Sequence, residues 1–258
     1  MAPAHEPDPH RGVFETLLVH DGEPVGLAAH LARLAASLEA LYDLPLPASG
    51  AARARQGAAG LGLGRLRLTA VPRGTEPRLQ IEAEEVDARL VFPTRGTILR
   101  SHPLPGGLGP HKLVDRPPLG RPTQGSGPLL VDAGEALETG WGNLFAVRGG
   151  VLRTPPLDGR ILPGTTRTAV LAIAAAAGIQ AEEQPLSRAD LLGAEEVFLT
   201  GSIRGIEAAL ELDGEPLPGG GALSRLLAAA LRSRWGLPAL PDDAPAPAAA
   251  LRPGRSAR

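Results

Sequence analysis

Apolar residues in the N-terminal part of the chain follow first a strand pattern and then a helical one. Residues 13–20 have the composition of a β-strand, and Asp21-Gly22 predicts a hairpin turn into a short strand at 24–27. Four leucines then recur at helical spacing and predict a helix that ends before Pro45: Leu31, Leu34, Leu38 and Leu41. An Ala-rich stretch predicts a second helix at 51–60, and strands are expected at 65–71, 78–84 and 90–92.

The second half of the chain predicts strands joined by tight turns, with helices between them. Gly149-Gly150 predicts a hairpin turn between two strands. Further strands are expected at 129–132, 180–185, 197–200 and 206–212. Helices are expected at 167–177, 188–192 and 222–234, and Ser187 with Asp190 resembles a capping box for the second of them.

This mixture of helices and strands indicates an α/β (mixed α+β) fold with two domains. We expect a smaller N-terminal α/β domain at 1–99 and a Pro/Gly-rich interdomain linker at 100–110. A larger C-terminal domain should span 111–236, followed by a disordered Pro/Ala-rich tail at 237–258.

Three chemical features converge on the segment between the linker and the helix at 167–177. Lys112 is the only lysine of the chain, so it is the one side chain that can form an imine as a free amine. Glu138 heads a strand, and the pair Thr165-Thr166 stands where a helix begins, which is a site suited to phosphate. An amine, a carboxylate and a phosphate seat are the parts that hold pyridoxal phosphate (PLP).

Composition narrows the possible functions. The net charge of −2 offers no positive field for nucleic acid, and the absence of cysteine excludes disulfides and thiolate chemistry. No metal site is expected, no apolar run is long enough for a membrane span, and the N-terminus lacks the apolar core of a signal peptide. We therefore expect a soluble cytoplasmic protein that binds neither nucleic acid nor membrane. The scarcity of lysine also reflects a bias toward Ala, Gly, Pro and Arg, which weakens the argument from a lone lysine.

The wording of several segments resembles the class IV aminotransferases, the fold type IV family of PLP enzymes. The segments that carry the resemblance are GVFETLLVHDGEPVGLAAHLARLAASLEAL, HKLVDR, LETGWGNLFAV, TPPLDGRILPGTTR and EEVFLTGS, and together they cover roughly residues 12–217. The resemblance implies a two-domain fold like that of D-amino acid aminotransferase, with the cofactor in the interdomain cleft. It also implies a homodimer that acts on a small-molecule amine substrate.

The resemblance assigns roles at the cofactor. Lys112 would form the Schiff base with PLP, and Glu138 would pair with the pyridine nitrogen. Four residues would form the phosphate cup: Arg33, Thr165, Thr166 and Ser202. From the residues alone, Arg33 could equally be a snorkelling side chain and Ser202 a turn hydroxyl.

Other residues near these motifs remain open. Asn143 lies five residues after Glu138, as in the family pattern, and would support the site from nearby, whereas Glu135 fits a turn carboxylate better. Thr16 matches a threonine that assists proton transfer in the lyases of the family, although threonine is also a common strand residue. Trp141 departs from the family pattern and is either a pocket wall or an exposed loop residue.

Two reactions fit the resemblance, and the pattern favours aminodeoxychorismate lyase, which forms 4-aminobenzoate for folate biosynthesis. Arg116 lies four residues after Lys112, as in the lyases. Pro117 stands where branched-chain aminotransferases carry a pocket tyrosine, and the only tyrosine is Tyr42. The chain is also short for a branched-chain aminotransferase.

The alternatives are an amino acid transaminase of branched-chain or D-amino acid type, and a catalytically inactive protein that keeps only the cofactor seat. The second stays open because fewer residues precede the Phe14-Glu15-Thr16 segment than in the family: either the smaller domain is trimmed or the start codon is misassigned.

Overall fold

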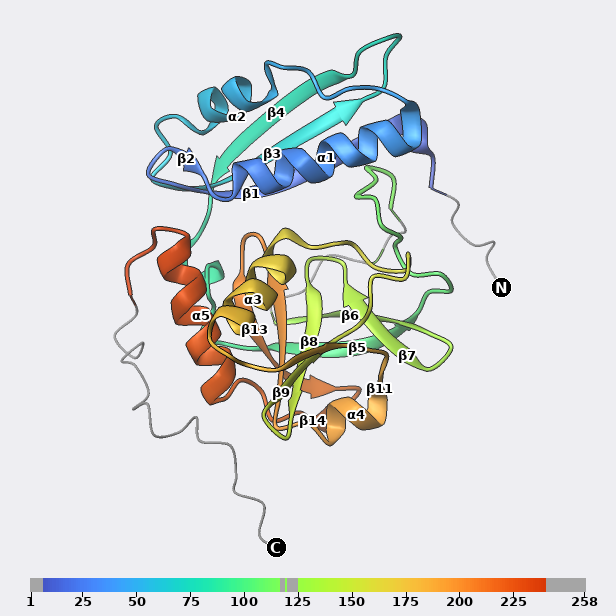
Figure 1. The fold of residues 1–258 in the computed structure, drawn as a ribbon, viewed down its shortest axis with the longest axis vertical. Coiled ribbons are helices and arrows are strands. Elements are labelled where there is room, and N and C mark those ends of the chain that lie inside the picture. The colour runs from blue at the N-terminus through green and yellow to red at the C-terminus, as the bar shows by residue number, and fades with distance from the viewer. Residues whose placement is uncertain (1–6, 117–118, 120–124, 240–258) are drawn as a thin grey trace, which may run out of the picture.

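The computed structural model describes residues 7–116, 119 and 125–239. Of the tail expected at 237–258, residues 240–258 lie outside this range. The fold consists of a small four-stranded sheet with two helices, stacked on a larger closed sheet (Figure 1). The described residues contain no helix long and apolar enough to cross a membrane.

The small layer has strand order β2-β1-β3-β4, and all its pairings are antiparallel. Its elements are β1 (Val13–His20), β2 (Glu23–Pro24), α1 (Leu27–Tyr42), α2 (Gly50–Ala58), β3 (Leu63–Val71) and β4 (Arg78–Glu85), preceded by a 3-10 turn at Pro9–Arg11. Both helices pack on one face of the sheet, where Leu34 and Leu38 of α1 meet Leu17, Leu66 and Leu68. The leucines that recur at helical spacing in the sequence therefore lie on the face of α1 that packs into this core.

The larger layer is a sheet that closes on itself. Strands follow the order β8-β12-β13-β5-β6-β7, and β7 meets β8 again through the single pair Glu138 and Asn143. The barrel strands are β5 (Thr97–Pro103), β6 (Ser126–Asp132), β7 (Glu135–Thr139), β8 (Asn143–Arg148), β12 (Glu196–Gly201) and β13 (Gly205–Leu212). The strands outside the closed barrel are β9 (Val151–Thr154), β10 (Ala181–Glu183), β11 (Leu186–Ser187) and β14 (Glu215–Pro216).

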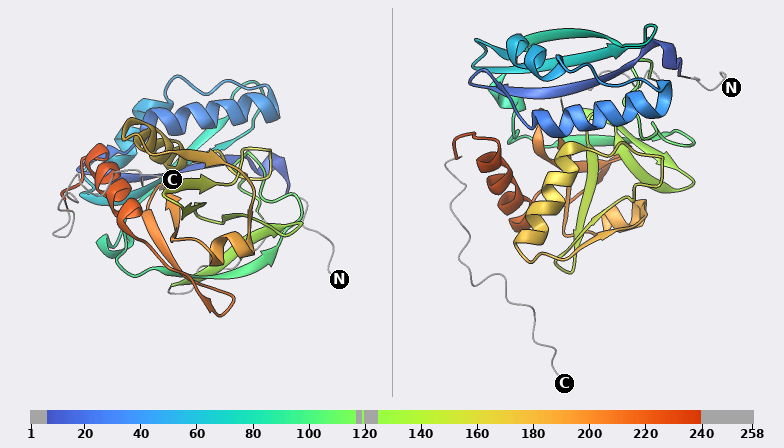
Figure 2. Two further views of the ribbon diagram at one scale, coloured as in Figure 1. Left: turned by 60° about the horizontal axis from the view of Figure 1, so that its bottom comes forward. Right: turned by 45° about the horizontal axis from the view of Figure 1, so that its top comes forward.

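Three helices belong to this layer: α3 (Thr165–Ala176), α4 (Arg188–Leu192) and α5 (Ala222–Arg234). Alternate residues of β8 serve two cores, because Leu144 faces the barrel interior while Phe145 faces α3 and α5. The rings of Phe145 and Phe198 stack there with centroids 5.3 Å apart. In both views of Figure 2, α1 lies alongside α3, so the two layers meet where α3 begins.

Two sequence expectations differ from the structure. Residues 97–103 form the barrel strand β5, although we expected 97–99 in the smaller domain and the linker from 100; parallel hydrogen bonding to β6 and β13 draws this segment into the barrel. The strand expected at 90–92 is wrong. Asp87 caps a 3-10 turn at Ala88–Leu90, and Phe92 adopts a left-handed conformation with φ 51°.

Candidate active site

A cavity of about 370 Å³ lies between the small sheet and the barrel. It contains every residue that the sequence put forward for the site: Thr16, Arg33, Lys112, Glu138, Asn143, Thr165, Thr166 and Ser202. Glu135 does not line it; that carboxylate instead starts β7 and forms an ion pair with Arg160. The structure thus brings the eight candidates together and separates Glu138 from the competing Glu135.

Lys112 is placed by the edge of β1. Its carbonyl accepts a hydrogen bond from the N–H of Phe14 at 2.9 Å, and Val114 donates to Gly12 at 2.9 Å, so this loop is hydrogen-bonded to the start of the strand. The amine lies 5.0 Å from the centroid of the Phe14 ring. Burial of the amine, opposed by Glu15 and reinforced by nearby arginines, lowers the pKa of Lys112 to about 7. A large fraction of this amine is therefore neutral at neutral pH.

Glu138 stands at the seam where β7 meets β8. Its carboxyl accepts hydrogen bonds from Asn143 Nδ2 at 3.1 Å and from the N–H of Leu162 at 3.1 Å. Asn143 Nδ2 also donates to the carbonyl of Leu162 at 2.9 Å, so the side chain of Asn143 joins the carboxylate to the loop before α3. Burial raises the pKa of Glu138 to about 8, although the Leu162 N–H and the charges of Arg116 and Lys112 oppose this. Without a cationic partner, Glu138 keeps its proton at neutral pH.

The N-terminus of α3 is an open anion seat. Its N-cap is Gly164, and no side chain caps the helix, so the N–H groups of the first turn remain free to bind a ligand. A side chain at position 164 would collide with Asn143 Oδ1, which explains the glycine. Thr165, Thr166 and Ser202 line the cavity around this helix end.

Arg33 reaches the same place from α1 but is engaged by protein groups. It donates to Glu15 through Nε at 2.8 Å and Nη2 at 2.6 Å, and to the carbonyl of Pro163 through Nη1 at 2.9 Å. Three of its five N–H groups are thus used, and the others remain for an anion. Its contact with a cofactor phosphate stays a prediction.

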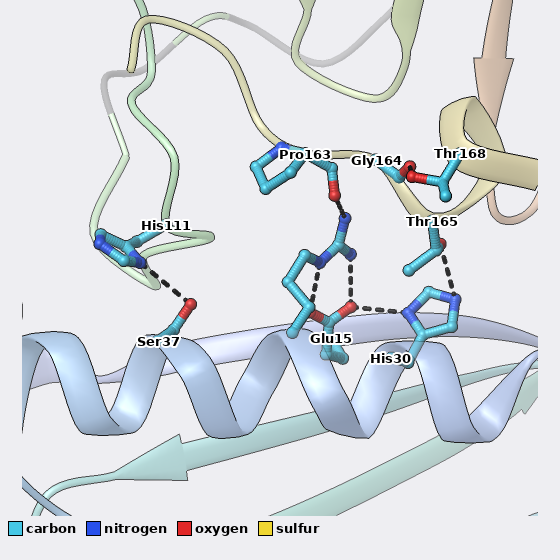
Figure 3. Close-up of polar contacts among 9 residues, drawn as sticks. Glu15, His30, Ser37, His111, Pro163, Gly164, Thr165 and Thr168 are labelled. Atoms are coloured by element: carbon cyan, nitrogen blue, oxygen red, sulfur yellow. Dashed lines mark hydrogen bonds and ion pairs between the residues drawn. The ribbon is translucent and has the colours of Figure 1, made fainter. Parts of the chain in front are cut away.

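The sequence pointed to Arg116 only as a mark of the lyases, and it did not single out Thr200 or Glu15. Within the described residues, Arg116 Nε and Nη2 and Thr200 Oγ1 are buried and have no hydrogen-bond partner, although both residues line the cavity. Glu15 is buried beneath α1 and joins His30 and Arg33 (Figure 3). For Glu15 and Thr200, the only signals in the sequence were a lone carboxylate within an apolar strand and a threonine two residues before Ser202.

Trp141 belongs to the pocket wall rather than to an exposed loop. It lines the cavity, and its ring lies against Gly127, where any side chain would collide with it. Its Nε1 donates to Glu207 Oε2 at 3.3 Å, and Arg204 pairs with the same carboxylate at 2.6 Å.

A family model described as "Amino-transferase class IV" matches residues 12–95 and 127–211 of this chain. The chain belongs to the class IV aminotransferase family. The enzymes of this family depend on PLP, and the residues of this cavity fit that cofactor. They provide a largely neutral buried amine, a buried carboxyl group, an uncapped helix N-terminus and buried donors without partners. The fold type IV architecture expected from the sequence is confirmed.

Individual relatives of this class IV family member point to two activities. A putative branched-chain-amino-acid aminotransferase of Methanocaldococcus jannaschii is 37% identical over 114 residues, which are 42% of this chain and 40% of that protein. This chain therefore matches well under two thirds of that relative's length. The 4-amino-4-deoxychorismate lyase of Pseudomonas aeruginosa is 28% identical, with a TM-score of 0.73 over 90% of this chain and 96% of its own. A hypothetical aminotransferase of Mycobacterium tuberculosis in an α-ketoglutarate and PMP bound form is 26% identical, with a TM-score of 0.72 over 91% and 94%.

Proposed function

We propose that this protein is a PLP-dependent aminodeoxychorismate lyase, which converts 4-amino-4-deoxychorismate to 4-aminobenzoate and pyruvate. The observation that carries the proposal is that Nε and Nη2 of Arg116 are buried and have no hydrogen-bond partner among the described residues, at the cavity that Lys112 also lines. A buried cation without an acceptor suits a carboxylate ligand, and the substrate bears carboxylates. Thr16 lines the same cavity, as the lyase assignment requires.

The aromatic lining of the cavity also supports a lyase over a branched-chain aminotransferase. Tyr42, the only tyrosine, does not line the cavity; its hydroxyl donates to the carbonyl of Pro9 at 2.6 Å. Pro117, which replaces the aminotransferase tyrosine in the sequence, lies outside the described residues. Phe14 and Trp141 are the aromatic residues that line this cavity, so an apolar surface without a phenol faces the substrate.

The residues that line the cavity would each have a part in this reaction. Bound PLP would supply an electron-accepting ring in conjugation with the substrate amine. Lys112 would hold the aldehyde and, once displaced, remove the proton from the carbon that bears the amine, for which its lowered pKa suits it. Glu138 would keep a proton at the pyridine nitrogen, and Asn143 would hold that carboxyl in place. Arg33, Thr166 and Ser202 would bind the phosphate with their side chains and Thr165 with its backbone N–H, and Arg116 would bind a substrate carboxylate.

An amino acid transaminase is the second candidate. It is favoured by the identity to the Methanocaldococcus jannaschii relative and by the likeness to the Mycobacterium tuberculosis protein, whose structure contains α-ketoglutarate. Such an enzyme would use the same lysine and carboxylate, and would return the proton to the cofactor rather than expel pyruvate.

Product analysis distinguishes these reactions. Purified protein is loaded with PLP, and 4-amino-4-deoxychorismate is added, with Lys112→Ala as the control. We expect 4-aminobenzoate and pyruvate in equal amounts, and neither from the variant. Formation of a keto acid from leucine or a D-amino acid, with no 4-aminobenzoate, would make the protein a transaminase. Cofactor absorbance without turnover of any of these substrates would leave a binding protein.

We also propose that the protein is a cytoplasmic homodimer, as family membership suggests, and that it serves the folate pathway, as the proposed lyase reaction implies. Light scattering after size-exclusion chromatography checks the assembly, since a monomer at micromolar concentration would contradict it. Growth of a 4-aminobenzoate-requiring strain that expresses the chain checks the pathway.

A further inference from the structure

A buried polar chain runs from the small sheet to the N-terminus of α3. Glu15 Oε2 lies 2.7 Å from His30 Nδ1, and His30 Nε2 lies 3.1 Å from Thr165 Oγ1 (Figure 3). Glu15 comes from β1, His30 from α1 and Thr165 from the first turn of α3. The chain therefore crosses from the small layer to the helix end that forms the anion seat.

The hydrogen positions along this chain follow from the charge of Glu15. Burial alone would raise the pKa of Glu15, but hydrogen bonds from Arg33 and His30 outweigh it and lower the pKa to about 2. An ionised carboxylate only accepts hydrogen bonds, so His30 Nδ1 must carry a proton. Burial lowers the pKa of His30, and Arg33 and Lys112 act in the same direction against Glu15. The ring is thus neutral, and its Nε2 is an acceptor.

The hydroxyl of Thr165 must then donate to His30. This bond points the hydroxyl toward α1 and away from the free N–H groups at the start of α3. A threonine in the first turn of a helix that lacks this partner is free to rotate and to hydrogen-bond locally with the backbone. The position of His30 keeps the side chain of Thr165 in one rotamer and leaves the seat open.

We propose that His30, oriented by Glu15, is a positioning residue for recognition of the cofactor phosphate, and that it acts through the hydroxyl of Thr165. The proposal rests on the proposed use of PLP at this site, but it does not depend on which reaction the enzyme catalyses. It concerns the phosphate alone, so it predicts a loss of affinity that pyridoxal, which has no phosphate, does not share.

The test compares the affinities of the cofactor-free protein for PLP and for pyridoxal, measured by absorbance titration. In His30→Leu, we expect the ratio of the two affinities to fall by about 3- to 10-fold, the effect of one neutral hydrogen bond. His30→Gln should retain most of the ratio, because its amide can donate to Glu15 and accept from Thr165. The double variant His30→Leu with Thr165→Val should show the ratio of Thr165→Val alone, because both changes interrupt the same path.

A matched control comes from the same helix. Ser37 of α1 also makes a polar contact, with His111 Nδ1 at 3.1 Å in the loop that carries Lys112, but it does not approach α3 (Figure 3). Ser37→Ala removes one polar contact from α1 and should leave the PLP/pyridoxal ratio unchanged. An unchanged ratio in His30→Leu, an equal fall in Ser37→Ala, or additive effects in the double variant would overturn the proposal. Equal loss of both ligands would show that His30 only supports the fold. Failure of the protein to bind either ligand would instead refute the proposed use of PLP.

Discussion

Arg116→Met should make the cofactor-free protein more stable and the enzyme less active. Two nitrogens of the guanidinium are buried without a partner in the described structure, and such groups cost about 1–3 kcal/mol each when charged donors are left unpaired. Methionine has a similar length and no polar group to satisfy. The two donors together cost about 2 kcal/mol or more, and loss of the contact between the guanidinium and the Phe14 ring, 5.6 Å away, offsets about 0.5–1 kcal/mol of the gain. We therefore expect the free energy of unfolding to rise by at least about 1–2 kcal/mol, which for a chain of this size raises the melting temperature by about 2–4 °C per kcal/mol.

The same change should remove the partner of the substrate carboxylate. Loss of one member of a desolvated charge pair costs about 2–5 kcal/mol. Since each 1.4 kcal/mol is tenfold, kcat/KM for 4-amino-4-deoxychorismate should fall by roughly 30-fold to several thousand-fold. Urea unfolding of the cofactor-free protein and a coupled assay of pyruvate release measure the two effects on one preparation.

Arg116→Lys is the control for charge without the guanidinium fork; it should stay close to the wild type in stability and recover only part of the activity. A methionine variant that loses both stability and activity would mean that Arg116 supports the fold. A methionine variant with full activity would mean that no substrate carboxylate binds at Arg116.

Three further outcomes follow from the site. The unfolded chain releases the proton of Glu138 near the ordinary pKa of 4.5, whereas the folded protein holds it up to a pKa of about 8, so wild-type stability falls as pH rises between these values. Glu138→Gln should abolish this decline. Urea unfolding of cofactor-free protein at pH 5 and pH 8 measures the change in stability. The rate at which cofactor-free protein captures pyridoxal should rise through pH 7, because only the neutral amine of Lys112 reacts and about half of it is neutral there. Gly127→Ala should displace the ring of Trp141, cost about 1–3 kcal/mol and alter the tryptophan fluorescence.

Each of these outcomes has a control. A Glu138→Gln variant whose stability still declines between pH 5 and pH 8 in parallel with the wild type would place the titrating group elsewhere. A capture rate that keeps rising toward pH 10 would give Lys112 an ordinary pKa, and Lys112→Ala should show no saturable capture. Gly62→Ala adds the same methyl group where nothing lies within 4 Å, so an equal loss of stability there would show that contact with Trp141 is not the cause.

Local elements were predictable because their signals are local. Gly149 and Gly150 both have positive φ, 61° and 72°, as a tight hairpin requires, and Ser187 with Asp190 forms a full capping box. The predicted helix at 222–234 has the bounds of α5, Ala222–Arg234. The eight candidate site residues were predictable because each belongs to a short family-like motif, and all eight line one cavity in the structure.

Features that depend on distant contacts were not predictable. Glu15 is one carboxylate in an apolar strand, and only the fold reveals that His30 and Arg33 lie over it. The role of residues 97–103 as a barrel strand depends on partners more than twenty residues away, so the nearby prolines and glycines indicated a linker instead. Trp141 likewise became a pocket wall only once Gly127 and Glu207 were brought beside it from other strands.

The seam between β7 and β8 has a consequence for how this chain can change in evolution. One residue pair joins the two strands, and the loop before α3 completes the closure through Leu162, whose N–H and carbonyl bind Glu138 and Asn143. An insertion in this loop would shift the pyridine end and the phosphate end of the site in one step. Among the described residues, the exposed hairpin turn at Gly149-Gly150 forms its side-chain hydrogen bonds with Glu195, so added length there disturbs few interactions. New length in this enzyme should therefore accumulate at the hairpin, while the loop that closes the barrel keeps its length.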